Sequence, residues 1–99
     1  MNEDITCAQV KQRLAEGQPF NFIDVREAWE HEEVNIGAQL IPLGDLPHRI
    51  AEIEHLKQEE IIVHCKSGSR SNQAKKFLIK SGFTNVRNMP GGITAFLAL

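Results

Sequence analysis

The segment Cys65-Lys66-Ser67-Gly68-Ser69-Arg70 carries the residue types that a nucleophilic site needs. It follows a short apolar run and precedes a helical pattern, so backbone N–H groups and the positive end of a helix dipole can converge on the sulfur. Gly68 allows backbone angles that a side chain would resist. These groups, with the charges of Lys66 and Arg70, favour the thiolate and lower the pKa of Cys65. The segment is therefore a candidate anion cradle around a nucleophile.

The two cysteines of the chain have different surroundings. A buried, unreactive cysteine at a strand end is the alternative interpretation of Cys65, because free cysteine is often a small core residue. The polar and glycine residues that follow Cys65 disfavour that alternative. Cys7 instead shares a predicted helical face with Val10 and Leu14, so we predict that it packs in the core. Both cysteines are expected to be free thiols in a reducing compartment.

The rest of the sequence predicts the elements that position this segment. A capping box from Thr6 to Gln9 begins the first helix, and Gly17 with Pro19 ends it. Beyond it, short β-prone runs alternate with helical patterns. The predicted strands cover residues 20–25, 38–41, 61–64 and 86–89. The predicted helices cover residues 7–16, a short turn at 28–33, a helix from about Asp45, residues 71–81, and a last helix ending at Leu99.

Alternation of strands and helices predicts an α/β fold with a central, mainly parallel sheet. We expect about five short strands, flanked by helices on both faces, and one domain over residues 1–99. Ile61-Ile62-Val63-His64 is the most apolar strand and should lie in the centre of the sheet. Ligands bind at the carboxyl ends of the strands in such sheets, which is where the Cys65 segment is expected.

Composition narrows the classes of function. The chain has 99 residues, 41% of them apolar, and a formal net charge of -2, which argues against general nucleic-acid binding. No stretch reaches the roughly 18 apolar residues of a membrane span, and the first residues lack a secretion pattern, so we expect a cytoplasmic protein without a membrane partner. The four histidines lack the short paired spacings of a zinc site, so no metal is expected. Nothing marks a dimer interface, so a monomer is expected.

Four segments of the chain resemble single-domain rhodaneses and occur in the order typical of that family. They are Asp24-Val25-Arg26-Glu27, the stretch from Gly37-Ala38 to Ile41-Pro42-Leu43, Cys65 to Ser71, and Asn88-Met89-Pro90-Gly91-Gly92-Ile93. The resemblance implies a rhodanese-like fold and a sulfurtransferase that needs no cofactor. Cys65 would take sulfane sulfur from thiosulfate or a persulfide as Cys65-S-SH, and pass it to cyanide, a thiol or a partner protein.

The resemblance also implies roles for the residues around Cys65. Backbone N–H groups along the loop would stabilise the persulfide anion. Ser67 and Ser69 would add hydroxyl donors and Lys66 a charge that steers anionic donors. The candidate substrate-binding residues of the loop are Lys66, Ser67, Gly68 and Ser69.

Two arginines and an aspartate complete the candidate site. Arg70 is expected to brace the loop and add to its positive field, because an arginine fork can hold several acceptors at once. Arg26 has two interpretations: it binds an anion in the pocket, or it pairs with a nearby carboxylate such as Asp24 or Glu27. The same carboxylates are the expected partners of Arg70. Asp24 is expected to give structural support.

The chain departs from the family pattern in two places. Asn35-Ile36-Gly37-Ala38 stands where relatives usually read His-Ile-Pro-Gly-Ala, and Phe96 stands where tryptophan is common. Both differences fall at the expected pocket rim and docking surface.

Two other functions remain as alternatives. A non-catalytic or partner-specific sulfur-relay module would keep the fold with little turnover of thiosulfate. A cysteine-dependent phosphatase or arsenate reductase would use a similar loop, but those enzymes space cysteine and arginine one residue further apart than Cys65 and Arg70.

Overall fold

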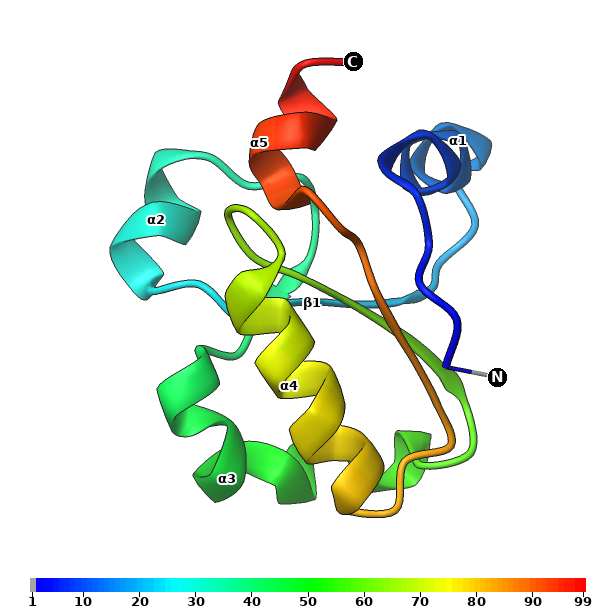
Figure 1. The fold of residues 1–99 in the computed structure, drawn as a ribbon, viewed down its shortest axis with the longest axis vertical. Coiled ribbons are helices and arrows are strands. Elements are labelled where there is room, and N and C mark those ends of the chain that lie inside the picture. The colour runs from blue at the N-terminus through cyan, green and yellow to red at the C-terminus, as the bar shows by residue number, and fades with distance from the viewer. Residues whose placement is uncertain (1) are drawn as a thin grey trace.

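A sheet of four parallel strands forms the centre of the computed structural model, which describes residues 2–99 (Figure 1). The strands are β1 (Asn21–Asp24), β2 (Gln39–Leu40), β3 (Glu60–His64) and β4 (Asn85–Asn88). Their order in the sheet is β2-β1-β3-β4, and each pairing is parallel. The predicted α/β class and parallel sheet are therefore confirmed, with the apolar strand β3 in the interior.

The described part of the chain has one strand fewer than the expected number of about five. Its N-terminal segment lies along the free edge of β4, where a further strand would pair. A single backbone hydrogen bond joins them there, from Ile5 N–H to the Asn88 carbonyl (2.9 Å). Side-chain oxygens accept two N–H groups of β4: Asn2 that of Val86 (2.7 Å) and Asp4 that of Asn88 (3.3 Å). The segment covers the edge without forming the repeated backbone pairs of a strand.

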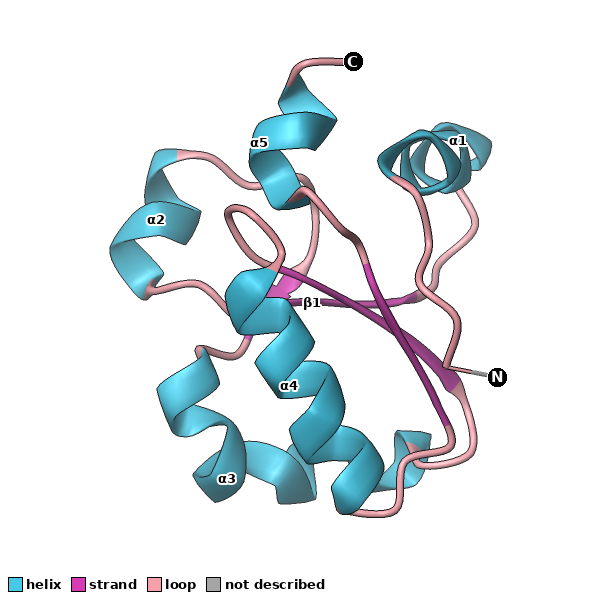
Figure 2. Ribbon diagram, viewed as in Figure 1, coloured by secondary structure: helices cyan, strands magenta, loops and turns pink. Residues whose placement is uncertain are grey.

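Helices cover both faces of the sheet, and Figure 2 shows α4 lying across the strands. On one face, α3 (Leu46–Arg49) and α4 (Ser69–Lys80) pack over a core that includes Ile23, Leu46, Ile61, Val63, Ala74, Leu78 and Val86. On the other face, α1 (Cys7–Glu16) and α5 (Gly92–Leu97) pack over a core that includes Cys7, Val10, Phe22, Ile62 and Met89. The remaining helix, α2 (Ala28–Glu33), follows β1. No helix within residues 2–99 is long and apolar enough to cross a membrane.

α4 begins two residues before the predicted start at residue 71. Gly68 precedes it with a φ of +103°, a left-handed conformation that turns the chain directly into the helix. The first helical hydrogen bond then runs from Asn72 N–H to the Gly68 carbonyl (3.0 Å). Ser69 and Arg70 therefore belong to the first turn of α4 rather than to the loop.

The helix predicted from about Asp45 is mostly a 3₁₀ helix. A short 3₁₀ turn at Leu43–Asp45 leads into α3, and a second 3₁₀ helix covers Ile50–Leu56. The apolar positions 50, 53 and 56 are three residues apart, which matches the three residues per turn of a 3₁₀ helix. The other predicted elements lie close to their predicted bounds, and the capping box at the start of α1 is present.

Candidate active site

Cys65 follows β3 in the loop that leads into α4, and its side chain is buried. Its Sγ accepts hydrogen bonds from the Gly68 N–H (3.1 Å) and the Ser71 hydroxyl (3.3 Å). Burial raises the pKa of the Cys65 thiol. Hydrogen bonds from the Ser71 hydroxyl and from the N–H groups of Ser71, Gly68 and Ser67 outweigh burial, so the pKa of Cys65 lies below its ordinary value. The loop therefore favours a thiolate, which is the nucleophilic form.

The hydroxyl that reaches Sγ is not one of those expected from the sequence. Ser67 and Ser69 are exposed, as is Lys66, whereas Ser71 is fully buried in the first turn of α4. The early start of α4 at Ser69 brings the Ser71 hydroxyl to the sulfur. The sequence shows that Ser71 lies six residues after Cys65. Whether the Ser71 side chain points toward the sulfur depends on where α4 begins.

Asn88, at the end of β4, connects the neighbouring strand to the loop. The Ser71 hydroxyl lies 2.6 Å from Asn88 Oδ1, and Asn88 Nδ2 donates to the Gly68 carbonyl (3.3 Å). Ser71 has one proton to donate, and three acceptors are within its reach: Asn88 Oδ1, the Gly68 carbonyl (3.2 Å) and Cys65 Sγ. A negative charge on Sγ makes the sulfur the strongest of these acceptors, since hydrogen bonds to ionised groups are stronger.

α5 holds the loop from its other side. The Ile93 N–H donates to the Cys65 carbonyl (2.9 Å), and the Thr94 N–H donates to the Lys66 carbonyl (3.1 Å). The C=O and N–H of a trans peptide group point in opposite directions. With the Lys66 carbonyl turned toward α5, the Ser67 N–H is directed to the side of the sulfur, where it helps to lower the pKa of Cys65.

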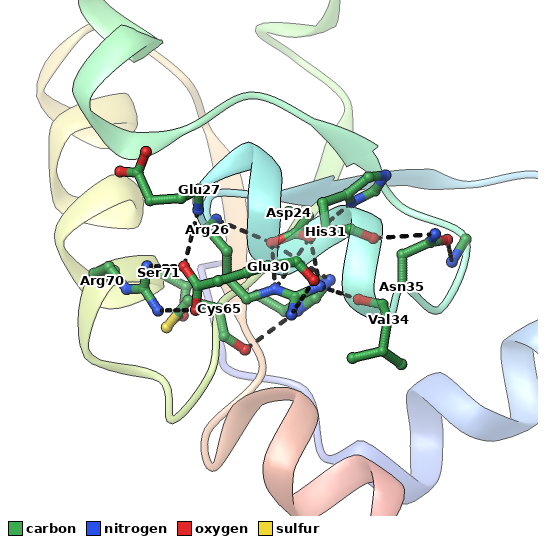
Figure 3. A network of polar contacts seen from close by, with 12 residues as sticks. Asp24, Arg26, Glu27, Glu30, His31, Val34, Asn35, Cys65, Arg70 and Ser71 are labelled. Atoms are coloured by element: carbon green, nitrogen blue, oxygen red, sulfur yellow. Dashed lines mark hydrogen bonds and ion pairs between the residues drawn. The ribbon is translucent and has the colours of Figure 1, made fainter.

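Arg70 pairs with Glu30 of α2 rather than with the expected Asp24 or Glu27 (Figure 3). The two terminal guanidinium nitrogens donate to the two carboxylate oxygens at 2.7 and 3.0 Å. The hydrogen bond from Arg70 lowers the pKa of Glu30 to about 2. Glu30 also accepts the Glu27 N–H (3.0 Å), so α2 and the first turn of α4 are joined through one carboxylate. The sequence did not predict Glu30 as the partner of Arg70. The only signal was the group of glutamates in the segment of residues 27–33, any of which could pair with an arginine.

Arg26 and Asp24 form a buried pair behind α2 (Figure 3). Arg26 donates to Asp24 (2.8 Å), and also to the carbonyls of Val34 (2.6 Å) and Glu30 (3.3 Å). Burial raises the pKa of Asp24, but hydrogen bonds from Arg26 and His31 outweigh it and lower that pKa. Arg26 therefore makes the contacts expected from the second interpretation, in which it pairs with Asp24. The pair ties the end of β1 to the middle and the C-terminal end of α2.

Cys7 packs in the core, as the sequence predicted, and lies on the opposite face of the sheet from the Cys65 side chain. Its Sγ lies 3.6 Å from the Pro90 carbonyl and 3.7 Å from the Gly92 carbonyl. Burial raises the pKa of Cys7, so this thiol stays protonated at neutral pH. Within residues 2–99, no group of three His, Cys, Asp or Glu side chains is arranged to hold a metal ion.

We expect Cys7→Ser to keep the sulfur-transfer rate within about twofold of the wild type, because an inert buried thiol takes no part in covalent catalysis. Steady-state rates of both proteins, measured at equal concentrations of folded protein, check this. A Cys7→Ser protein that folds but does not turn over would reverse the assignment of the two cysteines.

Comparison with known proteins places this geometry in a family. Residues 6–99 match the family model of the rhodanese-like domain. A sulfurtransferase of Allochromatium vinosum is 33% identical over 97 residues, which cover 97% of this chain and 89% of the relative. The thiosulfate sulfurtransferase PspE of Escherichia coli is 40% identical over 73 residues, which cover 72% of this chain and 69% of the relative. Four further curated relatives are longer, and the chain spans about half of their length or less.

A solved structure shows the same arrangement of elements. The crystal structure of a rhodanese-like domain protein from Staphylococcus aureus superimposes with a TM-score of 0.84 at 30% identity, covering 97% of this chain and 91% of the other. The four segments noted in the sequence thus lie on the fold that their order predicted. The chain belongs to the rhodanese-like family of sulfurtransferases.

Proposed function

We propose that the Cys65 thiolate accepts a sulfane sulfur atom, carries it as a persulfide, and passes it to a second nucleophile. The observation that carries this proposal is the surroundings of Sγ, which is buried yet receives hydrogen bonds from Gly68 and Ser71. Such donors stabilise a negative sulfur in both the free and the loaded protein. Lys66, exposed next to Cys65, would attract anionic donors.

The reaction is written with thiosulfate and cyanide as the simplest substrates. The Cys65 thiolate attacks the outer sulfur of thiosulfate, the S–S bond of thiosulfate breaks, and sulfite leaves with the electron pair. The product on the protein is Cys65-S-S⁻. Cyanide then attacks the terminal sulfur, the new S–S bond breaks, and thiocyanate leaves while the Cys65 thiolate returns. The named activity of PspE supports thiosulfate as a donor.

The position of Arg70 weighs against the phosphatase alternative. A phosphate in a cysteine loop needs an arginine fork free to hold its oxygens. Both terminal nitrogens of Arg70 donate instead to Glu30, which leaves the fork as a brace between α2 and α4. Four residues separate Cys65 from Arg70, which makes this loop one residue shorter than the loop of those phosphatases.

Intact-protein mass spectrometry after incubation with thiosulfate tests the proposal. We expect a gain of one sulfur atom, about 32 Da, that cyanide removes, as a persulfide on the nucleophile requires. Hydrolysis of a phosphate monoester without this gain would favour the phosphatase. If thiosulfate fails but a protein persulfide transfers sulfur to Cys65, the chain is the partner-specific relay.

Ser71→Ala should slow sulfur loading at neutral pH about tenfold, because a hydrogen bond to a charged group contributes about 1.5 kcal/mol. Loss of this donor raises the pKa of Cys65, and the rate rises with pH through that pKa because the thiolate is the nucleophile. The loading profile should therefore shift to higher pH. The two proteins should converge where both thiols are ionised; a constant ratio at every pH would show that Ser71 acts by another route.

A further inference from the structure

A cavity of about 170 Å³ lies beside the Cys65 loop, between α2 and α5. Trp29 and Val34 line it from α2 and the residue that follows this helix, and Ile93 and Leu97 line it from α5. Lys66 borders the cavity from the loop itself. The cavity therefore reaches the segment that carries the reactive cysteine.

Two of the apolar side chains that line this cavity are largely exposed to solvent. Trp29 is 65% exposed and Leu97 is 56% exposed. An exposed tryptophan among aliphatic side chains marks a binding surface more often than a random part of a protein, because its large apolar area gains from being covered.

The apolar walls are joined directly to the reacting centre. Ile93 lines the cavity and donates its N–H to the Cys65 carbonyl (2.9 Å). Thr94 lines it as well and donates to the Lys66 carbonyl (3.1 Å). A molecule that covers the apolar walls is thereby held next to the loop from which sulfur leaves.

The exposed charged side chains on and next to α2 are negative. α2 and the residue before it expose the carboxylates of Glu27, Glu32 and Glu33, and the last of these lines the cavity. Glu30 gives no net charge here, because Arg70 pairs with it. In the cavity itself Lys66 opposes Glu33. The excess of negative charge comes from Glu27 and Glu32, and it attracts cations to α2.

We infer that the cavity and α2 form the docking surface for an acceptor protein or peptide whose cysteine lies beside an apolar residue and is flanked by basic residues. This inference rests on the proposed function. The thiolate of the acceptor attacks the outer sulfur of Cys65-S-S⁻, having lost its proton to solvent. The S–S bond of the persulfide breaks, the Cys65 thiolate leaves with the electron pair, and the acceptor becomes a persulfide.

Three synthetic peptides of equal length, each with one cysteine, test the chemistry of the acceptor. The first has a leucine beside the cysteine and lysines on both sides, the second replaces the lysines by glutamates, and the third replaces the leucine by serine. Protein loaded with sulfur is mixed with each peptide, and the transfer rate constant is measured by mass spectrometry. At low salt we expect the first peptide to react about tenfold faster than the second, the gain that steering by charge gives.

Salt and matched variants locate the effect on the protein. The ratio of the two rates should fall toward one at about 0.5 M salt, where the screening length is roughly 4 Å. In the double variant Glu32→Gln, Glu33→Gln the ratio should also fall, and in Trp29→Ser the advantage of leucine over serine should be lost. Glu59→Gln and Ile79→Ser, which change an exposed carboxylate and an exposed apolar side chain elsewhere, should change neither ratio.

Equal rates for the lysine and glutamate peptides, or the same ratios in the α2 variants as in the control variants, would overturn the inference. Loading and cyanide release are measured on every variant first. If no persulfide forms on the wild type, the proposed function fails; if it forms and cyanide removes it, but the peptides are not distinguished, the docking surface alone fails.

Discussion

Cys65→Ser is expected to abolish sulfur transfer while leaving the fold in place. The hydroxyl is nearly isosteric with the thiol and can accept the same hydrogen bonds from Gly68 and Ser71, so the loop should keep its shape. A serine oxygen does not form a persulfide. We expect a loss of at least about a thousandfold in turnover, the scale seen when a covalent nucleophile is removed. Steady-state thiocyanate formation and the mass of the protein after thiosulfate treatment both measure it.

Thermal unfolding of Cys65→Ser supplies the control for this result. A melting curve close to that of the wild type shows that the loss comes from chemistry and not from unfolding. A folded Cys65→Ser protein that still gained one sulfur atom and returned it to cyanide would contradict the assignment of the nucleophile.

Gly92→Ala is expected to give the largest loss of stability among these variants, about 2–5 kcal/mol in the free energy of unfolding. Gly92 has a φ of +59°, where a side chain is strained. A Cβ at this position would also lie 2.5 Å from the Cys65 carbonyl oxygen and closer still to the Lys66 carbonyl oxygen. Relief of that collision would push α5 away from the loop, so sulfur loading should fall with stability. Urea unfolding and the loading rate measure the two effects.

Gly17→Ala separates the two causes. Gly17 also has a positive φ, +74°, but a Cβ there would meet no atom within 4 Å among the described residues. Its substitution should therefore cost only the backbone strain, about 1–2 kcal/mol, and leave sulfur loading unchanged. If the two glycine variants lost the same stability, the close packing of α5 on the loop would not be the reason for glycine at position 92.

The local parts of the site could be predicted from the sequence, and the long-range parts could not. The polar loop after an apolar strand is enough to predict Cys65 as the candidate nucleophile, because both the strand and the following helix are set by neighbouring residues. The partner of Arg70 is different, since Glu30 lies 40 residues away and is brought close only when α2 folds over the loop. The role of Ser71 depended on a helix start that a single φ at Gly68 determines.

The fold shows the same division. Strands and helices were found from periodicity, and the parallel sheet followed from their alternation. The number of strands does not follow from periodicity, because pairing at an edge depends on which donors the neighbouring segment meets. Asn2 and Asp4 satisfy those donors with side chains, a choice that no local pattern reveals. The 3₁₀ helix at Ile50–Leu56 was likewise predicted as part of an α-helix, because apolar residues three positions apart are compatible with both helix types.

The two edges of the sheet also affect the tendency of the protein to aggregate at high concentration. A bare strand edge is a template on which another chain can add itself and begin an aggregate. Here the outer strand β2 has only two residues, and the donors on the open side of β4 are already taken by Asn2 and Asp4. Neither edge offers a row of free backbone groups long enough to recruit a second sheet. The protein can thus expose the apolar side chain of Trp29 while its sheet edges remain protected against the strand addition that leads to fibrils.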